Sequence, residues 1–450
     1  MRSSRNLDMT QGHVLSLAVR FAIPLCIGNL LQQLYHTADT AVVGRFCGPL
    51  SLAAVATSAQ PVELLLQLFM GLGGGMSILV AQHVGGGRRE GMKSLLNTAV
   101  GFLYACAAAV TLLGVFAGPY VVRLMQAPED VYAHAAAYLR IIFLGALPSL
   151  GYNMNAGVLR GLGDSQSSLI FLIISCIANV VLDVVFVALF GMDVSGAALA
   201  TVIAQFASWI LSILYIRAKY PEMQLPMIPH KMERKVLGEI TRISVPLGIN
   251  HSFYSVGHLL MQSLINTQGA VFIAGCSVGG RMVELSHVSC ASLALAATTY
   301  AGQNYGAGRF DRVRQGTCIP LLAGGLTAVG SVLVSVFFKP ILSLFTSDPA
   351  VMANARLYFT VVTPSLAIYA VFAGIIALAN GIGEVRYPTL VNILMLWVVR
   401  IPVGHLIARF IDGRYVMAAI PVSFIFGISC MLLFFRSRKW QEVRMRAKAA

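Results

Sequence analysis

Two polar residues in a long apolar run have the types and spacing that ion chemistry inside a membrane requires. Asp183 lies in the run IISCIANVVLDVVFVALF, and Asn179 precedes it by four residues. In a helix this spacing places both side chains on one face. A carboxylate beside an amide oxygen is half of a site for a hard cation, or a carboxylate whose proton affinity depends on its surroundings. The alternative is a structural hydrogen bond from Asp183 to a neighbouring helix.

Depth in the membrane extends this cluster to two further oxygen-bearing side chains. At 1.5 Å per helical residue, Asp39 lies about 36 Å beyond the start of its apolar run, and Asp183 lies about 27 Å beyond the start of its own. Thr201, in a run of the opposite direction, lies about 12 Å below the same surface. Asp39 could instead mark the interfacial end of a helix. The sequence therefore predicts one pocket for H⁺ or Na⁺ and no other metal, formed by Asp39, Asn179, Asp183 and Thr201.

The composition requires that these residues be carried by membrane helices. The 450 residues are 57% apolar and only 11% charged, and their mean hydropathy is +0.77. A soluble protein of this size has about 25% charged residues, so a soluble enzyme is excluded. A membrane β-barrel would show short alternating segments, whereas these runs are continuously apolar. The sequence predicts an all-α polytopic membrane protein.

Apolar runs bounded by glycine, proline or charge give twelve candidate spans. Most of the 32 lysines and arginines flank these spans on the side that carries both termini. Positive charge is retained on the cytoplasmic side, so both termini are predicted to be cytoplasmic. The net charge of +14 then reflects membrane topology and anionic lipid, and we expect no nucleic-acid binding. The spans are 15–40, 51–82, 94–118, 131–157, 166–190, 194–217, 237–265, 270–300, 314–343, 352–379, 388–410 and 415–436.

The two halves of the chain repeat one another at a separation of about 220 residues. Arg20 and Pro24 match Arg242 and Pro246, and the segment GLGD (161–164) matches GIGE (381–384). Each repeat has six spans, so a pseudo-twofold axis along the membrane normal relates the two lobes. The predicted domains are an N-terminal lobe (1–217), a cytoplasmic loop (218–236), a C-terminal lobe (237–436) and a basic cytoplasmic tail (437–450).

The repeat also serves as an internal control for the ion site. The positions of Asp39 and Asp183 correspond to Met261 and Val403, so we expect the ion site only in the first lobe. The second lobe keeps Glu284, whose repeat partner is Glu63. Arg281 lies three residues before Glu284, and the two are expected to neutralise one another, with substrate contact as the alternative.

Other conspicuous residues have simpler interpretations. Pro24 and Pro246 begin the first span of each lobe and either permit a helix to bend or only pack. The glycine-rich segment GLGGG (71–75) lacks the Lys-Ser/Thr of a phosphate loop and predicts close helix packing. Histidines in or near the spans lack metal-ligand spacing, and we expect no catalytic residues.

Six segments together resemble the multidrug and toxic compound extrusion (MATE) family over essentially the whole chain. The resemblance implies two six-helix lobes and a cation-coupled antiporter that exports amphipathic, often cationic, organic compounds. It implies no cofactor besides the coupling ion. The segments are PLCIGNLLQQLYHTADTAVVGRFCG (24–48), VAQHVGGGR (80–88), VLRGLGDSQ (158–166), NVVLD (179–183), AGQNYGAGR (301–309) and NGIGEVRYP (380–388).

The resemblance is closest to the DinF-like branch, whose acidic network lies in the first lobe. Its pattern falls on the four pocket residues found by spacing and adds Tyr138 as a polar neighbour. Three further positions match residues that line the substrate cavity of that branch: Gln32, Tyr35 and Asn153. The other major branch relies on acids in the second lobe, and Val403 departs from that pattern.

The expected function is therefore H⁺- or Na⁺-coupled export across the inner (cytoplasmic) membrane by a monomer that contacts small organic substrates and lipid. Oxygen ligands and a titrating carboxylate use the same residues, so the choice between H⁺ and Na⁺ stays open. The first alternative is a lipid-linked precursor flippase of a related two-lobe fold. Such a protein would favour a cationic central cavity, whereas lysine and arginine here lie mostly in loops. A membrane enzyme or receptor is the second alternative.

Overall fold

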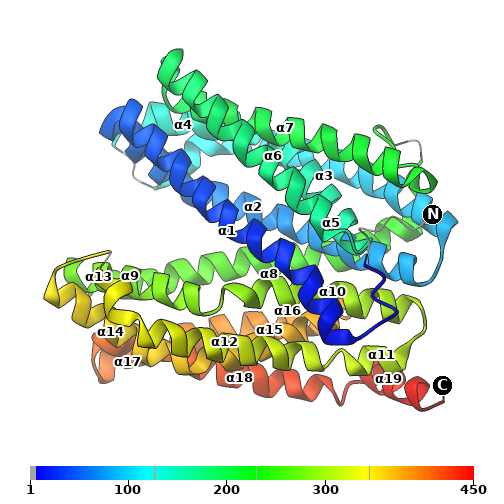
Figure 1. Ribbon diagram of the computed structural model, residues 1–450. Coiled ribbons are helices and arrows are strands. Elements are labelled where there is room, and N and C mark those ends of the chain that lie inside the picture. The colour runs from blue at the N-terminus through cyan, green and yellow to red at the C-terminus, as the bar shows by residue number, and fades with distance from the viewer. Residues whose placement is uncertain (1–6, 126–127, 230, 344, 450) are drawn as a thin grey trace. The chain divides into compact units, whose positions relative to one another are not determined.

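The computed structural model describes residues 7–125, 128–229, 231–343 and 345–449, apart from the side chains of residues 34–41, 49, 52, 448 and 449. Within these ranges the chain is almost entirely helical and has no β-strand (Figure 1). Helices satisfy every backbone hydrogen bond internally, as an apolar chain in lipid must. The predicted all-α fold class is confirmed.

Nine of the described helices are long and apolar enough to cross a membrane. A tenth crossing is formed by α4 (Glu129–Leu144) and α5 (Ala146–Gly161) if this pair, bent by 49°, counts as one span. Two of the twelve predicted spans are less apolar than the others. They correspond to α8 (Arg234–Asn266), and to α9 (Ala270–Ser286) with α10 (Val288–Gly306).

Polar residues account for this difference. In α8, His251, His258 and Gln262 interrupt the apolar sequence. Between α9 and α10 the helix breaks at His287, one turn after the charged residue Glu284. The break also leaves α9 only 17 residues long. Polar residues are tolerated in membrane helices where they face a protein interior or a watery cavity.

Contacts divide the chain into two compact units. The first contains Ile27–His251. Within it α6 packs against α7, and α4 and α5 also pack against α7 (Figure 1). Besides α4 and α5, its elements are α1 (Val14–Phe46, from Ile27 on), α2 (Gly48–Gly85), α3 (Arg89–Leu124), α6 (Ser165–Asp183), the π-helix η1 (Val184–Leu189), α7 (Asp193–Lys219), η2 (Pro221–Met223) and the first part of α8.

The second unit contains Asp8–Cys26 and Ser252–Ala450. In it α9 packs against α14, and α15 packs against α10, α12 and α18. Besides α9 and α10, its elements are α11 (Phe310–Gln315), α12 (Cys318–Val336), α13 (Phe338–Ser343), α14 (Pro349–Val362), η3 (Thr363–Ser365), α15 (Leu366–Gly381), α16 (Arg386–Ile393), the π-helix η4 (Leu394–Arg400), α17 (Ile401–Phe410), η5 (Gly413–Ala418), α18 (Ala419–Phe434) and α19 (Arg438–Ala449).

Two helices pass from one unit into the other. Helix α1 changes unit after Cys26, two residues beyond Pro24, and α8 changes unit after His251, five residues beyond Pro246. Each helix therefore carries a proline, which removes one backbone hydrogen bond, just before the change.

The glycine-rich segment of α2 packs closely against α5, as its sequence predicts. A Cβ at Gly73 would come within 2.6 Å of the carbonyl oxygen of Asn153 on α5, and Gly157 on α5 faces the backbone of Gly73 in return. At the next residue, Gly74, a Cβ would meet only Leu247 Cδ1 at 3.6 Å. Small residues let two membrane helices approach in this way.

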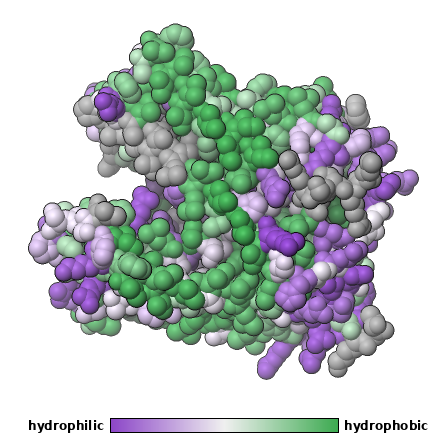
Figure 2. All heavy atoms as spheres, viewed as in Figure 1, coloured by the Kyte–Doolittle hydropathy of each residue, from purple (hydrophilic) through white to green (hydrophobic). Residues whose placement is uncertain are grey.

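The second unit shows the surface expected of a protein in lipid. Large apolar side chains project outward along α12, where Leu321 is 65% exposed and Val336 is 69% exposed. Figure 2 shows this surface as largely hydrophobic, and it shows hydrophilic residues gathered around α11 and α19. Apolar side chains on such a face are accommodated by acyl chains, and the polar end lies at the membrane–water boundary.

Candidate functional site

Asp183 and Asn179 are both buried on α6. Asp183 is the last residue of this helix and is fully buried, and Asn179 is 2% exposed one turn earlier. Burying a carboxylate in apolar surroundings costs several kcal/mol unless polar groups or an ion compensate it. The position is therefore suited to a group that gains a proton or a cation.

The side-chain amide of Asn179 connects α6 to α7. Because a carboxylate accepts hydrogen bonds, the amide nitrogen faces Asp183, with a distance of 2.8 Å to Oδ2. In this orientation the amide oxygen accepts from both the hydroxyl and the backbone N–H of Thr201, each at 3.1 Å. The structure thus brings together Asn179, Asp183 and Thr201, which the sequence predicts as one cluster.

The backbone changes form directly after this cluster. Asp183 is followed by the π-helix η1, whose wider turns are uncommon and occur often at functional sites. Oxygen atoms of a carboxylate, an amide and a hydroxyl are what Na⁺ would require here, and the same carboxylate can take up a proton.

Three of the other predicted site residues have described side chains. Tyr138 is 8% exposed on α4, a helix that packs against α7. Asn153 is half-buried on α5 and donates to the carbonyl oxygen of Ser149 at 2.9 Å. Gln32 is exposed on α1. The side chains of Asp39 and Tyr35 lie outside the described residues.

The predicted charge pair of the second lobe is present. Arg281 Nη1 lies 3.8 Å from Glu284 Oε2, and both side chains are more than 60% exposed. In the first unit Glu63 accepts a hydrogen bond of 2.6 Å from Gln67. Arg281 therefore has a carboxylate partner on its own helix, α9, whereas Glu63 is paired with an uncharged amide.

Sequence reasoning missed Arg400, which is 4% exposed at the end of η4. Its Nε donates to Ser423 Oγ at 2.9 Å, and its guanidinium carbon lies 5.0 Å from the centroid of the Phe424 ring. A single arginine inside the apolar run LMLWVVRIPVG (394–404) was the available signal, because charged residues inside spans are usually functional.

A buried ion pair lies at the N-terminal end of α6, in the first unit. Asp164 is fully buried and caps α6, and its Oδ2 lies 2.7 Å from Lys219 Nζ and 2.9 Å from the Tyr220 hydroxyl. Burial alone would raise the pKa of Asp164, but hydrogen bonds from Lys219 and Ser167 outweigh it and hold the pKa below its ordinary value. The sequence marks Asp164 only as part of the repeated GLGD segment.

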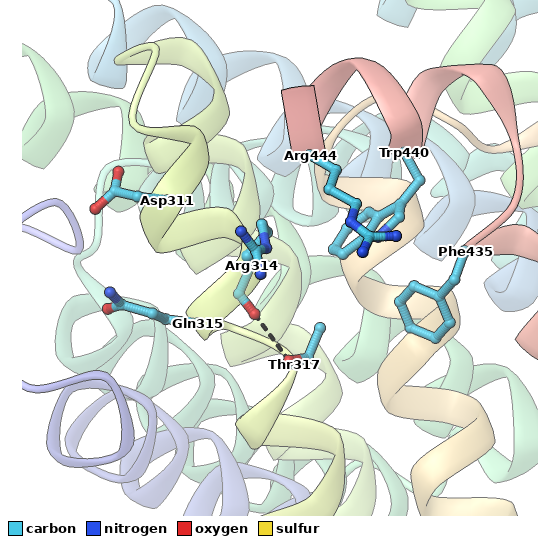
Figure 3. Close-up of a pocket in the computed structure, with 7 residues that line it drawn as sticks. All are labelled: Asp311, Arg314, Gln315, Thr317, Phe435, Trp440 and Arg444. Atoms are coloured by element: carbon cyan, nitrogen blue, oxygen red, sulfur yellow. Dashed lines mark hydrogen bonds between the residues drawn. The ribbon is translucent and has the colours of Figure 1, made fainter. Parts of the chain in front are cut away.

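Two open cavities lie at helix ends. One of about 560 Å³ lies between α11 and α19 and is lined by Arg314, Trp440 and Arg444, among others (Figure 3). Another of about 670 Å³ lies beside α3 and η2. Neither cavity is lined by Tyr138, Asn179, Asp183 or Thr201, the predicted ion-site residues whose side chains are described. Among the described residues no group of three or more His, Cys, Asp or Glu side chains could hold a metal.

Comparison with known proteins places the chain in a family. The family model MatE matches residues 24–185 and again 246–406. The chain is a MATE family transporter. Because the two matches begin at Pro24 and Pro246, the internal repeat read from the sequence is confirmed. MATE proteins are membrane transporters of small molecules, so this chain is a protein of the cell membrane.

Similar chains extend over nearly the full length of this MATE protein. A Bacillus subtilis protein called "Probable multidrug resistance protein YpnP" is 29% identical over 97% of this chain and 98% of its own. A Thermotoga maritima protein called "Probable multidrug resistance protein NorM" is 25% identical over 94% and 92%.

Solved structures support the same fold. A MATE structure in a bent conformation has a TM-score of 0.90 at 23% identity and covers 99% of this chain and 100% of that one. A transporter from Pyrococcus furiosus, described as having a binding pocket of reverse polarity, has a TM-score of 0.84 at 22% identity and covers 100% of this chain and 99% of that one. The twelve-helix, two-lobe layout predicted from the sequence is consistent with these neighbours.

Proposed function

We propose that this MATE transporter exports amphipathic, often cationic, organic compounds in exchange for an inward-moving H⁺ or Na⁺. The buried cluster of Asn179, Asp183 and Thr201 is the observation that supports ion coupling. The substrate class is supported by relatives named as multidrug resistance proteins.

In this mechanism the carboxylate of Asp183 alternates between two states. In one state it is charged and accepts the hydrogen bond from Asn179, and in the other it is protonated or binds Na⁺. Because Asn179 also accepts from Thr201, the change of charge on α6 alters the contact with α7. Asp39 is proposed as the second carboxylate of the site. Coupling requires that ion and substrate prefer different conformations by a few kcal/mol.

The proposal also includes the membrane topology, the branch of the family and the oligomeric state. We place both termini in the cytoplasm, because lysine and arginine flank the spans on that side. We assign the chain to the DinF-like branch, because the acidic cluster lies in the first lobe and Val403 replaces an acid in the second. The working unit is a monomer without a resident cofactor.

Reconstituted vesicles test the proposal. Efflux of an ethidium-like organic cation would be driven separately by a pH gradient and by a Na⁺ gradient. We expect efflux with one of the two ions, and we expect Asp183→Asn to abolish it. Asp130→Asn removes a carboxylate on the exposed first turn of α4 and is the matched control, which should transport normally.

Two results would contradict the proposal. Unchanged gradient-driven efflux by Asp183→Asn would exclude Asp183 as the coupling group. No efflux under either gradient, in protein shown to be folded, would favour a lipid-linked precursor flippase over a drug exporter.

A further inference from the structure

The fifth span of each repeat carries a buried charge next to a π-helix, and the two charges are opposite: Arg400 lies three residues before Val403, the counterpart of Asp183. In the first unit Asp183 directly precedes η1, and in the second unit Arg400 is the last residue of η4. Both π-helices lie in the fifth span of their repeat, and both side chains are buried. The second unit therefore has a cation in the region where the first has a carboxylate.

One nitrogen of the buried Arg400 guanidinium lacks a hydrogen-bond acceptor among the described residues. Its Nε is bonded to Ser423, and its face lies against Phe424, but the buried Nη2 has no hydrogen-bond partner among the described residues. One turn earlier, the buried indole Nε1 of Trp397 also lacks a partner there. Buried donors without acceptors are destabilising, and more so when charged, so two of them one turn apart suggest that an acceptor binds between them.

No carboxylate of the second unit supplies that acceptor. From Ser252 to Arg436 the chain has Glu284 as its only acid within the spans, since Asp311, Asp348, Glu384 and Asp412 lie near helix ends. Glu284 is already paired with Arg281 at 3.8 Å. Among the described residues Arg400 forms no ion pair, so no carboxylate of the second unit neutralises this buried charge.

The Phe424 ring that lies against the guanidinium belongs to a row of neighbouring aromatic rings. The Tyr369 and Phe424 ring centroids are 4.6 Å apart, and the His287 and Tyr369 centroids are 6.1 Å apart. Such rings provide flat apolar surface for an organic ligand. The arginine beside Phe424 provides the charged, bidentate contact that a carboxylate needs.

We propose that Arg400 is a binding site for the carboxylate of an organic substrate, with Trp397 as a second donor. This inference rests on the proposed function and deepens it, because it assigns the residues that would hold the carboxylate of an exported compound. The acidic first-lobe site binds the coupling ion, and the basic second-lobe site selects the substrate.

Equilibrium binding of two dyes tests the site without any ion gradient. Rhodamine 110 has a free carboxyl group, and rhodamine 123 is its methyl ester. Fluorescence polarisation would be measured with the full chain in lipid nanodiscs. We expect the wild type to bind the free acid more tightly than the ester. Arg400→Gln should weaken binding of the free acid about tenfold or more and leave binding of the ester within about twofold.

Two further variants separate binding from structure. Arg400→Lys keeps the charge and should retain part of the preference for the free acid. Arg409→Gln is the matched control, because Arg409 lies on the adjoining helix α17 and also contacts a phenylalanine ring but is exposed. It should bind both dyes like the wild type.

The inference is overturned if Arg400→Gln binds both dyes like the wild type. It is equally overturned if both affinities fall together with the melting temperature, since Arg400 would then be purely structural. A wild type that does not prefer the free acid would also contradict it. These results are independent of ion coupling, which the efflux assay with Asp183→Asn measures separately.

Discussion

Asp183 and Thr201, on the neighbouring helices α6 and α7, are joined through one amide, that of Asn179. The carboxylate accepts from the amide nitrogen, and the hydroxyl and backbone N–H of Thr201 donate to the amide oxygen. A proton or Na⁺ on Asp183 would remove or weaken the first bond. The amide could then reorient, so the occupancy of one side chain is transmitted to the next helix.

Thr201→Val tests this connection because valine has nearly the same shape but no hydroxyl. We expect the protein to fold and to transport at saturating ion concentration. Loss of one hydrogen bond, about 1–1.5 kcal/mol, should raise the ion concentration for half-maximal efflux about five- to tenfold. The measurement is dye efflux from vesicles as a function of the coupling ion.

Thr201→Ser is the control for that experiment, since it restores the hydroxyl. Its ion dependence should be close to that of the wild type. If valine and serine variants have the same ion dependence, the Thr201 hydroxyl has no part in ion binding.

The buried pair of Asp164 and Lys219 predicts an acid-sensitive fold. The pKa of Asp164 is lowered in the folded state, so its stabilisation is fully present above the ordinary value of 3.8 and is lost as pH falls below it. Asp164→Asn leaves Lys219 without its carboxylate and should lower the free energy of unfolding by about 3 kcal/mol near neutral pH. Thermal unfolding in detergent between pH 3 and pH 7 measures both effects.

Glu384 is the matched control, because it occupies the same place in the second repeat. Its carboxylate lies 3.8 Å from Lys439, and both side chains are more than a quarter exposed. Such pairs contribute less than about 1 kcal/mol, so Glu384→Gln should have a small effect. Equal losses in the two variants would show that burial does not distinguish the pairs.

Adjacent glycines on α2 give a prediction about helix packing. Gly73→Ala places a Cβ 2.6 Å from the Asn153 carbonyl oxygen, a backbone atom that cannot move aside easily. We expect a loss of about 1–3 kcal/mol, seen as a lower melting temperature and yield. Gly74→Ala meets only a leucine methyl group at 3.6 Å and should be neutral or slightly stabilising. A reversed order of the two variants would contradict the α2–α5 packing.

Much of the fold and part of the site follow from local sequence features. Continuous apolar runs determine the fold class, and the spacing of Asn179 and Asp183 places them on one helix face. The depth of Thr201 below the membrane surface, calculated from the rise per helical residue, assigns it to the same cluster. Each of these inferences needs only one helix or a comparison of helix lengths.

The missed features depend on which helices become neighbours. Arg400 is recognisable as a site through Ser423 and Phe424, which lie on α18 and not on its own helix. The sequence also does not show where α1 and α8 pass from one unit into the other. An apolar run shows that a helix is buried or in lipid, but it does not show which helices it packs against. The bend between α4 and α5 is not evident from the sequence for the same reason.

The proline in α1 gives a prediction about the rate of conformational change. Pro24 is buried inside the helix and removes a backbone hydrogen bond to Arg20, two residues before α1 passes into the other unit. Pro24→Ala restores that bond and should stiffen the helix. If bending of α1 opens and closes the transport path, the maximal efflux rate should fall about tenfold while dye affinity in nanodiscs stays within twofold.

Pro119→Ala, at a buried proline inside α3, is the control and should leave the rate unchanged. A wild-type rate in Pro24→Ala would mean that Pro24 only packs, and an equal fall in both variants would indicate general damage to helix packing.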